Sequence, residues 1–129
     1  MTEPEKKDLL NYRLTRAKET IEEVDILIEN KLWNTAVNRL YYACFYAVSG
    51  LLVYNSLNAQ THAGVRQMFG LHFVKTGLID KSLGKFYTDI FDKRQSGDYD
   101  DFISYTKDDV IDLLEPAKHL IKAIEKIVY

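Results

Sequence analysis

The residues of this chain that could do chemistry lie around Arg94. Arg94 lies four positions after Ile90, so this arginine continues the apolar stripe of a predicted helix instead of its solvent face. Asp98 follows four residues later, and Tyr99 comes next. Two interpretations are open. The group is either a polar cluster that binds phosphate or a partner at a groove, or an ion pair between Arg94 and Asp98 that closes the turn after the helix.

A second pair of residues, His62 and Arg66, could join that chemistry. They stand four residues apart and could share one helix face. His62 could supply a proton-transferring group to Arg94, either from another part of the fold or from a second subunit. A partly exposed histidine near a helix start is more often structural than catalytic, so a structural role for His62 is favoured over a catalytic one.

The other histidines and the single cysteine indicate no metal chemistry. His72 falls on the apolar side of its helix and is predicted to be a hydrogen-bonded core residue, and His119 has no companion at ligand spacing. Cys44 lies inside an apolar stretch. This pattern lacks the spacing of a zinc site, and the chain has no phosphate-binding loop. The sequence therefore predicts no metal site and no cofactor.

Composition places the chain among ordinary globular proteins. Its 129 residues, 47% hydrophobic and 28% charged, predict one domain over residues 1–129 with a sizeable core. A formal charge of −2 gives the whole chain no electrostatic attraction to nucleic acid or to an anionic membrane. One unpaired cysteine fits a reducing compartment, and the charged start MTEPEKKD has no apolar signal core. We expect a cytoplasmic protein.

The stretch NRLYYACFYAVSGLLVYN (38–55) is the element that must position Arg94, His62 and the other candidate residues. No charge follows Arg39 within it, and a segment apolar on nearly all faces must be buried on nearly all faces. It is too short and too rich in tyrosine for a membrane span, which needs about 20 mostly apolar residues. We therefore predict a central helix from about Leu32 to Tyr54, in which the tyrosines pack in the core instead of stacking on nucleobases.

A long helix precedes the central one. It is predicted to begin near Glu3 or Pro4, and its apolar residues recur at steps of three and four as far as Ile28. The connection that follows is short, which makes the two helices antiparallel neighbours. Asn34 could cap the central helix.

Three more helices are predicted after the central one. A shorter helix occupies 61–77, and another follows Asp80 as far as about 95, after which SGDYDDF (96–102) is predicted to be a turn. The last helix follows a capping box at Thr106, with a kink expected at Pro116. The predicted fold class is all-α, an antiparallel up-and-down four-helix bundle with one additional shorter helix.

Three stretches carry a resemblance to a known family. They are NRLYYACFYAVSGLL (38–52), THAGVRQMFGLHFVKTGLID (61–80) and KFYTDIFDKRQSGDYDDF (85–102), and they cover most of the domain. In order and spacing they resemble the HEPN domains, which are small prokaryotic helical bundles. The chain is most similar to small stand-alone HEPN proteins that are often encoded beside a minimal nucleotidyltransferase.

The resemblance bears on activity through Arg94. Many HEPN domains are metal-independent ribonucleases whose motif is an arginine followed, a few positions later, by a histidine. Arg94 aligns with that arginine, but no histidine occurs from Gln95 to Asp101. Cleavage of this kind needs a group that titrates near neutrality, and an arginine can clamp a phosphate without acting as a base. The departure argues against ribonuclease activity.

The resemblance implies three alternative functions. The preferred one is an interaction or nucleic-acid-associated module paired with a nucleotidyltransferase in a toxin–antitoxin-like system. The second is a metal-independent endoribonuclease that uses Arg94 with His62 or Asp98. The third is a nucleotide-binding module without catalysis. In each of them Arg94, Tyr99 and Arg66 are the candidate contacts to phosphate, RNA or a partner.

The central helix also predicts a homodimer. A helix this apolar needs more cover than its neighbours in a small bundle provide. Part of the second and third helices, or the 61–77 segment, is expected to lie in a two-fold interface.

Overall fold

The computed structural model describes all 129 residues and confirms the all-α bundle. Its helices are α1 (Glu3–Glu29), α2 (Trp33–Tyr54), α3 (His62–Phe69), α4 (Lys81–Tyr99) and α5 (Lys107–Val128). A π-helical turn, η1 (Gly70–Val74), continues α3. Four helices are long and one is short, as the sequence predicts.

Helix α2 is the centre of the molecule and contacts all four other helices. Alanines at 36, 43 and 47 are fully buried and let neighbouring helices approach closely. At Gly50 an added Cβ would lie 3.2 Å from the Cβ of Arg13, so α1 and α2 are nearly in backbone contact there. By length and composition α2 could also cross a membrane, but 67% of its most apolar window is buried inside the bundle.

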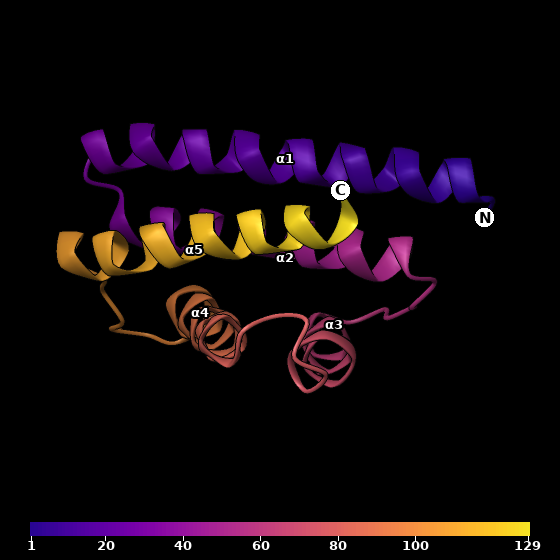
Figure 1. Cartoon of the computed structure of the whole chain (residues 1–129). Coiled ribbons are helices and arrows are strands. Elements are labelled where there is room, and N and C mark those ends of the chain that lie inside the picture. The colour runs from indigo at the N-terminus through magenta and orange to yellow at the C-terminus, as the bar shows by residue number, and fades with distance from the viewer.

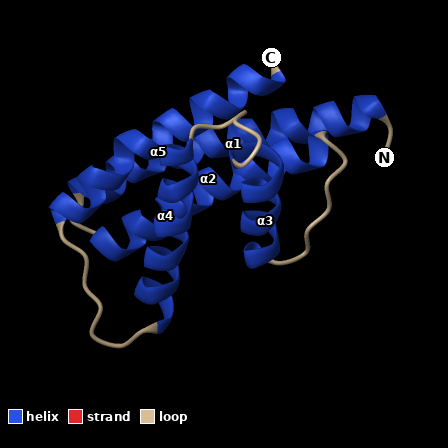
Figure 2. Ribbon diagram, turned by 60° about the horizontal axis from the view of Figure 1, so that its bottom comes forward, coloured by secondary structure: helices blue, strands red, loops and turns tan.

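The helices form two sets that cross each other. In Figure 1, α1, α2 and α5 lie lengthwise, whereas α3 and α4 are seen nearly end-on. Figure 2 shows α3 and α4 running beside each other, with the N-terminal end of α3 and the C-terminal end of α4 at the same edge. The residues at these two ends are the ones that the sequence selects for chemistry.

The end of α4 differs from the prediction. The turn predicted at 96–102 is wrong for its first four residues, because α4 continues to Tyr99. Gly97 is helical and tightly covered, since an added Cβ would lie 2.8 Å from the ring of Tyr105. The ion pair between Arg94 and Asp98 spans this last turn. Packing and an i,i+4 pair therefore override the turn propensity of Gly and Asp.

Two side-chain predictions are also wrong. Asn34 does not cap α2; its Oδ1 accepts a hydrogen bond from the Tyr105 amide at 2.8 Å, and its Nδ2 donates to the Ile103 carbonyl at 3.1 Å. His72 is exposed, and Phe73 takes the buried position. The wider π turn carries the inward face one residue further along the chain than the sequence pattern indicates.

The start of α5 is as predicted. Thr106 Oγ1 accepts from the Asp109 amide at 3.2 Å, and the Asp109 carboxylate accepts from the Thr106 amide at 2.8 Å. This reciprocal pair satisfies two amide groups that a helix N-terminus leaves without partners. The helix then runs without interruption past Pro116.

Candidate functional site

Arg94 is a charged group on the buried side of α4. Tyr87, Ile90 and Phe91 precede it on the same buried stripe, and Arg94 itself is only 7% exposed. Burying a charge is costly unless its neighbours compensate. The contacts of Arg94 therefore define what the site can do.

Two tyrosine rings and one carboxylate surround the guanidinium. Its central carbon lies 4.6 Å from the ring centroid of Tyr41 and 5.6 Å from that of Tyr42, which are cation–π distances. Its Nη1 lies 3.7 Å from the Asp98 carboxylate, and that carboxylate accepts a hydrogen bond from Asn38 at 2.9 Å. The Nε of Arg94 is buried and has no hydrogen-bond partner. One donor of the group is thus unused within the chain.

Helix α3 brings a histidine to this cluster. Thr61 starts the helix by accepting a hydrogen bond from the Gly64 amide at 2.9 Å. His62, the first helical residue, forms a 2.7 Å hydrogen bond between its Nδ1 and the Tyr41 hydroxyl. Its ring stacks on Phe45 with 4.4 Å between the centroids. The second ring nitrogen, Nε2, is the one that can serve a ligand.

The environment favours the neutral form of His62. Partial burial lowers the pKa of the imidazole below its ordinary value of 6.5, and the positive charge of Arg94 lowers it further. The imidazole is therefore uncharged near neutral pH, the state in which it can accept a proton.

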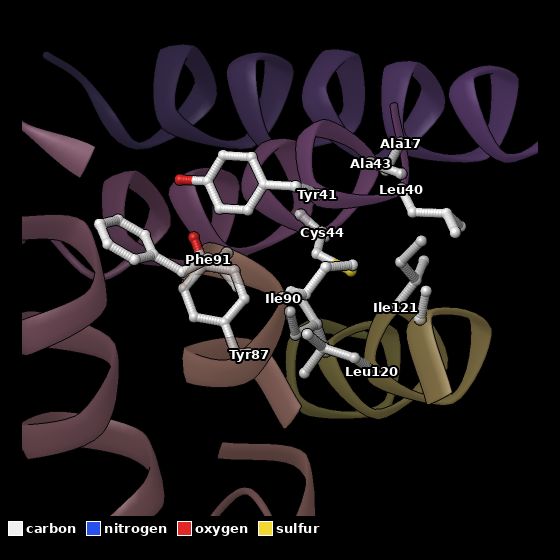
Figure 3. Packing of buried hydrophobic residues seen from close by; sticks show 14 of the residues in the cluster. Ala17, Leu40, Tyr41, Ala43, Cys44, Tyr87, Ile90, Phe91, Leu120 and Ile121 are labelled. Carbon is white, nitrogen blue, oxygen red and sulfur yellow. The ribbon is translucent and has the colours of Figure 1, made fainter. Parts of the chain in front are cut away.

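Tyr87 adds a second buried phenol to the cluster, next to that of Tyr41. Tyr41 stacks on Tyr87 with 6.1 Å between the ring centroids, and Figure 3 shows both rings with Phe91 at one end of the buried cluster. Burial raises the pKa of both phenols, and it raises that of Tyr87 well above its ordinary value. The Tyr87 hydroxyl is buried without a hydrogen-bond partner. Buried polar groups without partners are rare in native proteins, and the cluster holds two.

Of the other predicted site residues, Arg66 lies at the margin and Tyr99 lies outside. The guanidinium of Arg66 is 4.4 Å from the ring centroid of Phe91 and 3.9 Å from the Asp92 carboxylate. It reaches the cluster only through Phe91, which packs edge-on against Tyr41. Tyr99 is 74% exposed.

The structure thus brings Arg94, Asp98 and His62 together, and both interpretations of Arg94 hold in part. The ion pair with Asp98 exists, and it belongs to a larger polar cluster. The sequence interpretation missed Asn38 and the polar role of Tyr41. Their spacing could have indicated them, since residues three or four apart share a helix face.

Other parts of the molecule are weaker candidates for a functional site. A hollow of about 500 Å³ between α1 and α5 is open and has mixed charge, with Lys18, Glu22, Lys118 and Glu125 among its lining residues. No group of three or more His, Cys, Asp or Glu residues could hold a metal ion. Cys44 is buried, and burial raises the pKa of its thiol far above the physiological range.

The fold is an all-α bundle with a buried arginine and with a histidine on its short helix. These features place the chain in a class of small helical domains, and comparison with known proteins identifies the family. The HEPN domain model matches residues 10–127, and the chain belongs to the HEPN family. It is 40% identical to a UPF0332 protein of Thermotoga maritima, over 96% of this chain and 94% of the relative.

Two relatives in Methanocaldococcus jannaschii have names that refer to a function. One, named "Putative toxin MJ0605", is 43% identical over 64% of this chain and 62% of its own length. The other, named "Putative toxin MJ0142", is 30% identical over 91% of this chain and 80% of its own length.

Proposed function

We propose that this protein is the toxin-like HEPN subunit of a two-protein system, and that its partner is a nucleotidyltransferase. The Arg94 cluster is its functional site. The observation that carries this proposal is the buried Nε of Arg94, which has no partner although the guanidinium is held by Tyr41, Tyr42 and Asp98. An arginine kept only for stability would be expected to use its donors within the chain.

The parts of the proposal have different support. The names of the two relatives from Methanocaldococcus jannaschii support toxicity. The nucleotidyltransferase follows from the resemblance to small HEPN proteins that are encoded beside one. Phosphate is the chemical group that suits Arg94, because a guanidinium donates to phosphate oxygens through several N–H groups at once.

Controlled expression in a bacterial host tests toxicity. The wild-type chain is expected to arrest growth, and Arg94→Ala is expected to abolish the arrest at equal protein level. Lys93→Ala is the matched control, since Lys93 is the exposed neighbour of Arg94 on the same helix and should leave the arrest intact. Normal growth with abundant wild-type protein would contradict the proposal, as would an arrest that survives Arg94→Ala.

Co-expression tests the partner. If a nucleotidyltransferase is encoded next to this chain, its co-expression is expected to restore growth, and a variant without its catalytic carboxylates is the control. Growth arrest that the intact enzyme does not relieve would remove the partner from the proposal while leaving toxicity standing.

One observation favours a second function, metal-independent cleavage of RNA. The family motif lacks its histidine here, but His62 enters the Arg94 cluster from another helix. In this alternative Arg94 holds the scissile phosphate, and neutral His62 accepts the proton of the attacking 2′-hydroxyl. The 2′-oxygen bonds to phosphorus as the bond from phosphorus to the 5′-oxygen breaks, which leaves a 2′,3′-cyclic phosphate, and the 5′-oxygen takes its proton from water. Asp98 is disfavoured as that base because its carboxylate is already paired with Arg94 and accepts a hydrogen bond from Asn38.

The assay for this alternative uses labelled structured RNA in EDTA. Cleavage that persists in EDTA and disappears in both Arg94→Ala and His62→Gln would establish it. His119→Gln is the control, because His119 lies exposed on α5. Equal cleavage by wild type and both variants would indicate a contaminating nuclease and reject the alternative.

A further inference from the structure

A hollow lies between α4 and the helix formed by α3 and η1, where these helices run beside each other (Figure 2). It measures about 220 Å³, and its lining residues include Arg66, Gly70, Gly84, Lys85 and Thr88. Small-molecule sites usually have about 300–1,000 Å³, so this hollow suits one large apolar side chain better than a whole ligand. We call it the Gly70 hollow.

The two glycines of the Gly70 hollow differ in what the fold requires of them. A Cβ added at Gly84 would lie 2.7 Å from a γ-carbon of Val74, so α4 and η1 can approach each other only because this residue is glycine. A Cβ added at Gly70 would meet no atom within 4 Å, and the backbone there is right-handed helical with a φ of −59°. Glycine weakens a helix relative to alanine, and neither packing nor backbone conformation requires it at position 70. The open space over Gly70 therefore indicates a group that approaches from outside the chain.

The helix is irregular at the same place. The Gly70 carbonyl accepts a hydrogen bond from the Lys75 amide at 2.9 Å, and this bond across five residues closes the π turn η1. Such turns are rare in proteins and are frequent at functional sites. Leu71, which follows Gly70, is 54% exposed, and Leu78, in the turn between η1 and α4, is 59% exposed. The segment around the hollow thus presents apolar surface to solvent.

The same region is positively charged within a negatively charged chain. From 66 to 88 there are four basic residues and one acidic residue, which are Arg66, Lys75, Lys81, Lys85 and Asp80. These charges give +3, so the total of −2 leaves −5 for the rest of the chain. A surface of this kind attracts a negatively charged partner.

Several of these positive charges are available to a partner. Lys75 and Lys81 form no ion pair in the chain. The Lys85 ammonium lies 3.1 Å from the Asp89 carboxylate, but the two side chains are 79% and 48% exposed. Exposed ion pairs contribute little to stability, so an incoming carboxylate can replace Asp89.

We propose that the Gly70 hollow is the docking site of an acidic helical segment of a partner protein. One large apolar side chain of that segment enters the hollow over Gly70, and carboxylates one turn before and after it meet Arg66 and Lys85. Amphipathic helices bind grooves in this way, and a single buried anchor supplies much of the affinity. This inference goes beyond the proposed function and does not depend on toxicity or on a nucleotidyltransferase.

The charges and the exposed residues favour an acidic protein segment over other occupants. In a two-fold contact through this surface, the positive region of one copy would face that of the other copy, which is repulsive. Single-stranded nucleic acid binds on aromatic side chains that stack with its bases, whereas the exposed apolar residues here are Leu71 and Leu78.

A display library of helical peptides tests the docking site. Each peptide has one central position varied among all residue types, and positions one turn away on either side varied among Asp, Glu, Lys and Arg. The immobilised wild-type protein is the target, and Gly70→Trp serves for counter-selection because its side chain fills the hollow. Selection is expected to enrich Leu, Met or Phe at the centre and Asp or Glu at the flanks.

Fluorescence anisotropy of the most enriched peptide then tests individual residues. Gly70→Trp and Lys85→Glu are each expected to raise its dissociation constant at least about tenfold, because one removes the space for the anchor and the other reverses a charge at the rim. Lys122→Glu is the matched control. Lys122 is an exposed lysine on α5, which does not contact α3 or η1, so this variant should bind as the wild type does. Higher salt should weaken binding to the wild type.

Gly70→Ala keeps the test decisive if Gly70→Trp does not fold. The added methyl group meets no atom of the chain, so the thermal midpoint should equal or exceed that of the wild type. The methyl group occupies space that the anchor needs, so the dissociation constant of the peptide should rise at least about threefold.

Several outcomes would overturn the inference. They are a selection that enriches no acidic peptide with an apolar centre, unchanged peptide binding in Gly70→Ala or in a folded Gly70→Trp, and a Gly70→Ala variant that is less stable than the wild type. Binding of single-stranded RNA in place of the peptide, with the RNA affinity lost in Lys85→Glu, would also overturn it and assign the region to nucleic acid.

Discussion

The two sides of α2 are built from different chemistry. One side carries Leu40, Ala43, Cys44 and Ala47, all fully buried in the apolar cluster. The other side carries Asn38, Tyr41, Tyr42 and Phe45, which meet His62, Asp98 and Arg94. Two buried side-chain atoms lack a hydrogen-bond partner, the Tyr87 hydroxyl oxygen and the Arg94 Nε, and both residues pack against this second side of α2.

The difference shows where this chain is stabilised and where it is not. Apolar burial contributes about 25 cal/mol per Å² and needs no partner atoms. Buried hydroxyl and guanidinium groups without hydrogen-bond partners oppose folding, because nothing in the folded chain compensates for the loss of their hydration. Under the function proposed above, these groups are kept together on one side of the central helix for binding or chemistry.

The largest effect is expected on the apolar side. Leu40→Ala should lower the free energy of unfolding by about 2–5 kcal/mol, because Leu40 is fully buried and its removal leaves a cavity. Urea denaturation followed by circular dichroism measures the change. A loss below about 1 kcal/mol would mean that this side of α2 is not the main source of stability.

On the polar side, the two members of the ion pair should behave differently. Asp98→Ala should cost about 1–3 kcal/mol, because it leaves the guanidinium of Arg94 buried without a counter-charge. Arg94→Met should change stability by no more than about 1 kcal/mol, since Asp98 is partly exposed and keeps Asn38. Equal losses in parallel urea titrations would show that the pair acts as an ordinary stabilising contact.

Removing the hydroxyl group should have different effects on stability at the two tyrosines. Tyr41→Phe removes the hydrogen bond to His62 and should cost about 0.5–1.5 kcal/mol. Tyr87→Phe removes a buried hydroxyl that has no partner, so it should be neutral or stabilising. Thermal denaturation of both variants is the measurement. A marked loss of stability in Tyr87→Phe would show that its hydroxyl has a partner in solution.

The smallest effect concerns protonation. NMR titration should give His62 a pKa below 6.5, and Arg94→Met should raise that pKa without restoring 6.5, because burial is the larger cause. The unfolded chain then binds more protons than the folded one, so the contribution of His62 to stability is lost as pH falls through the lowered pKa. A pKa above 6.5 in the wild type would contradict the placement of His62.

The sequence predicted the helices well because their apolar residues recur at three and four positions. It predicted the buried position of Arg94 for the same reason, since four residues after Ile90 the stripe reaches an arginine. It did not predict the contact of His62 with Tyr41, because this depends on how α3 crosses α2, and helix periodicity holds no information on crossing. The exposure of His72 depends on the π turn, which the sequence pattern does not show.

We infer that Arg94 is kept for function and not for folding. Arg94→Met tests it most directly when the urea midpoint and the growth arrest are measured on the same variant. The expected result is a midpoint close to that of the wild type, together with complete loss of the arrest. A variant that loses about 3 kcal/mol or more of stability, and whose remaining toxicity follows the amount of folded protein, would contradict it.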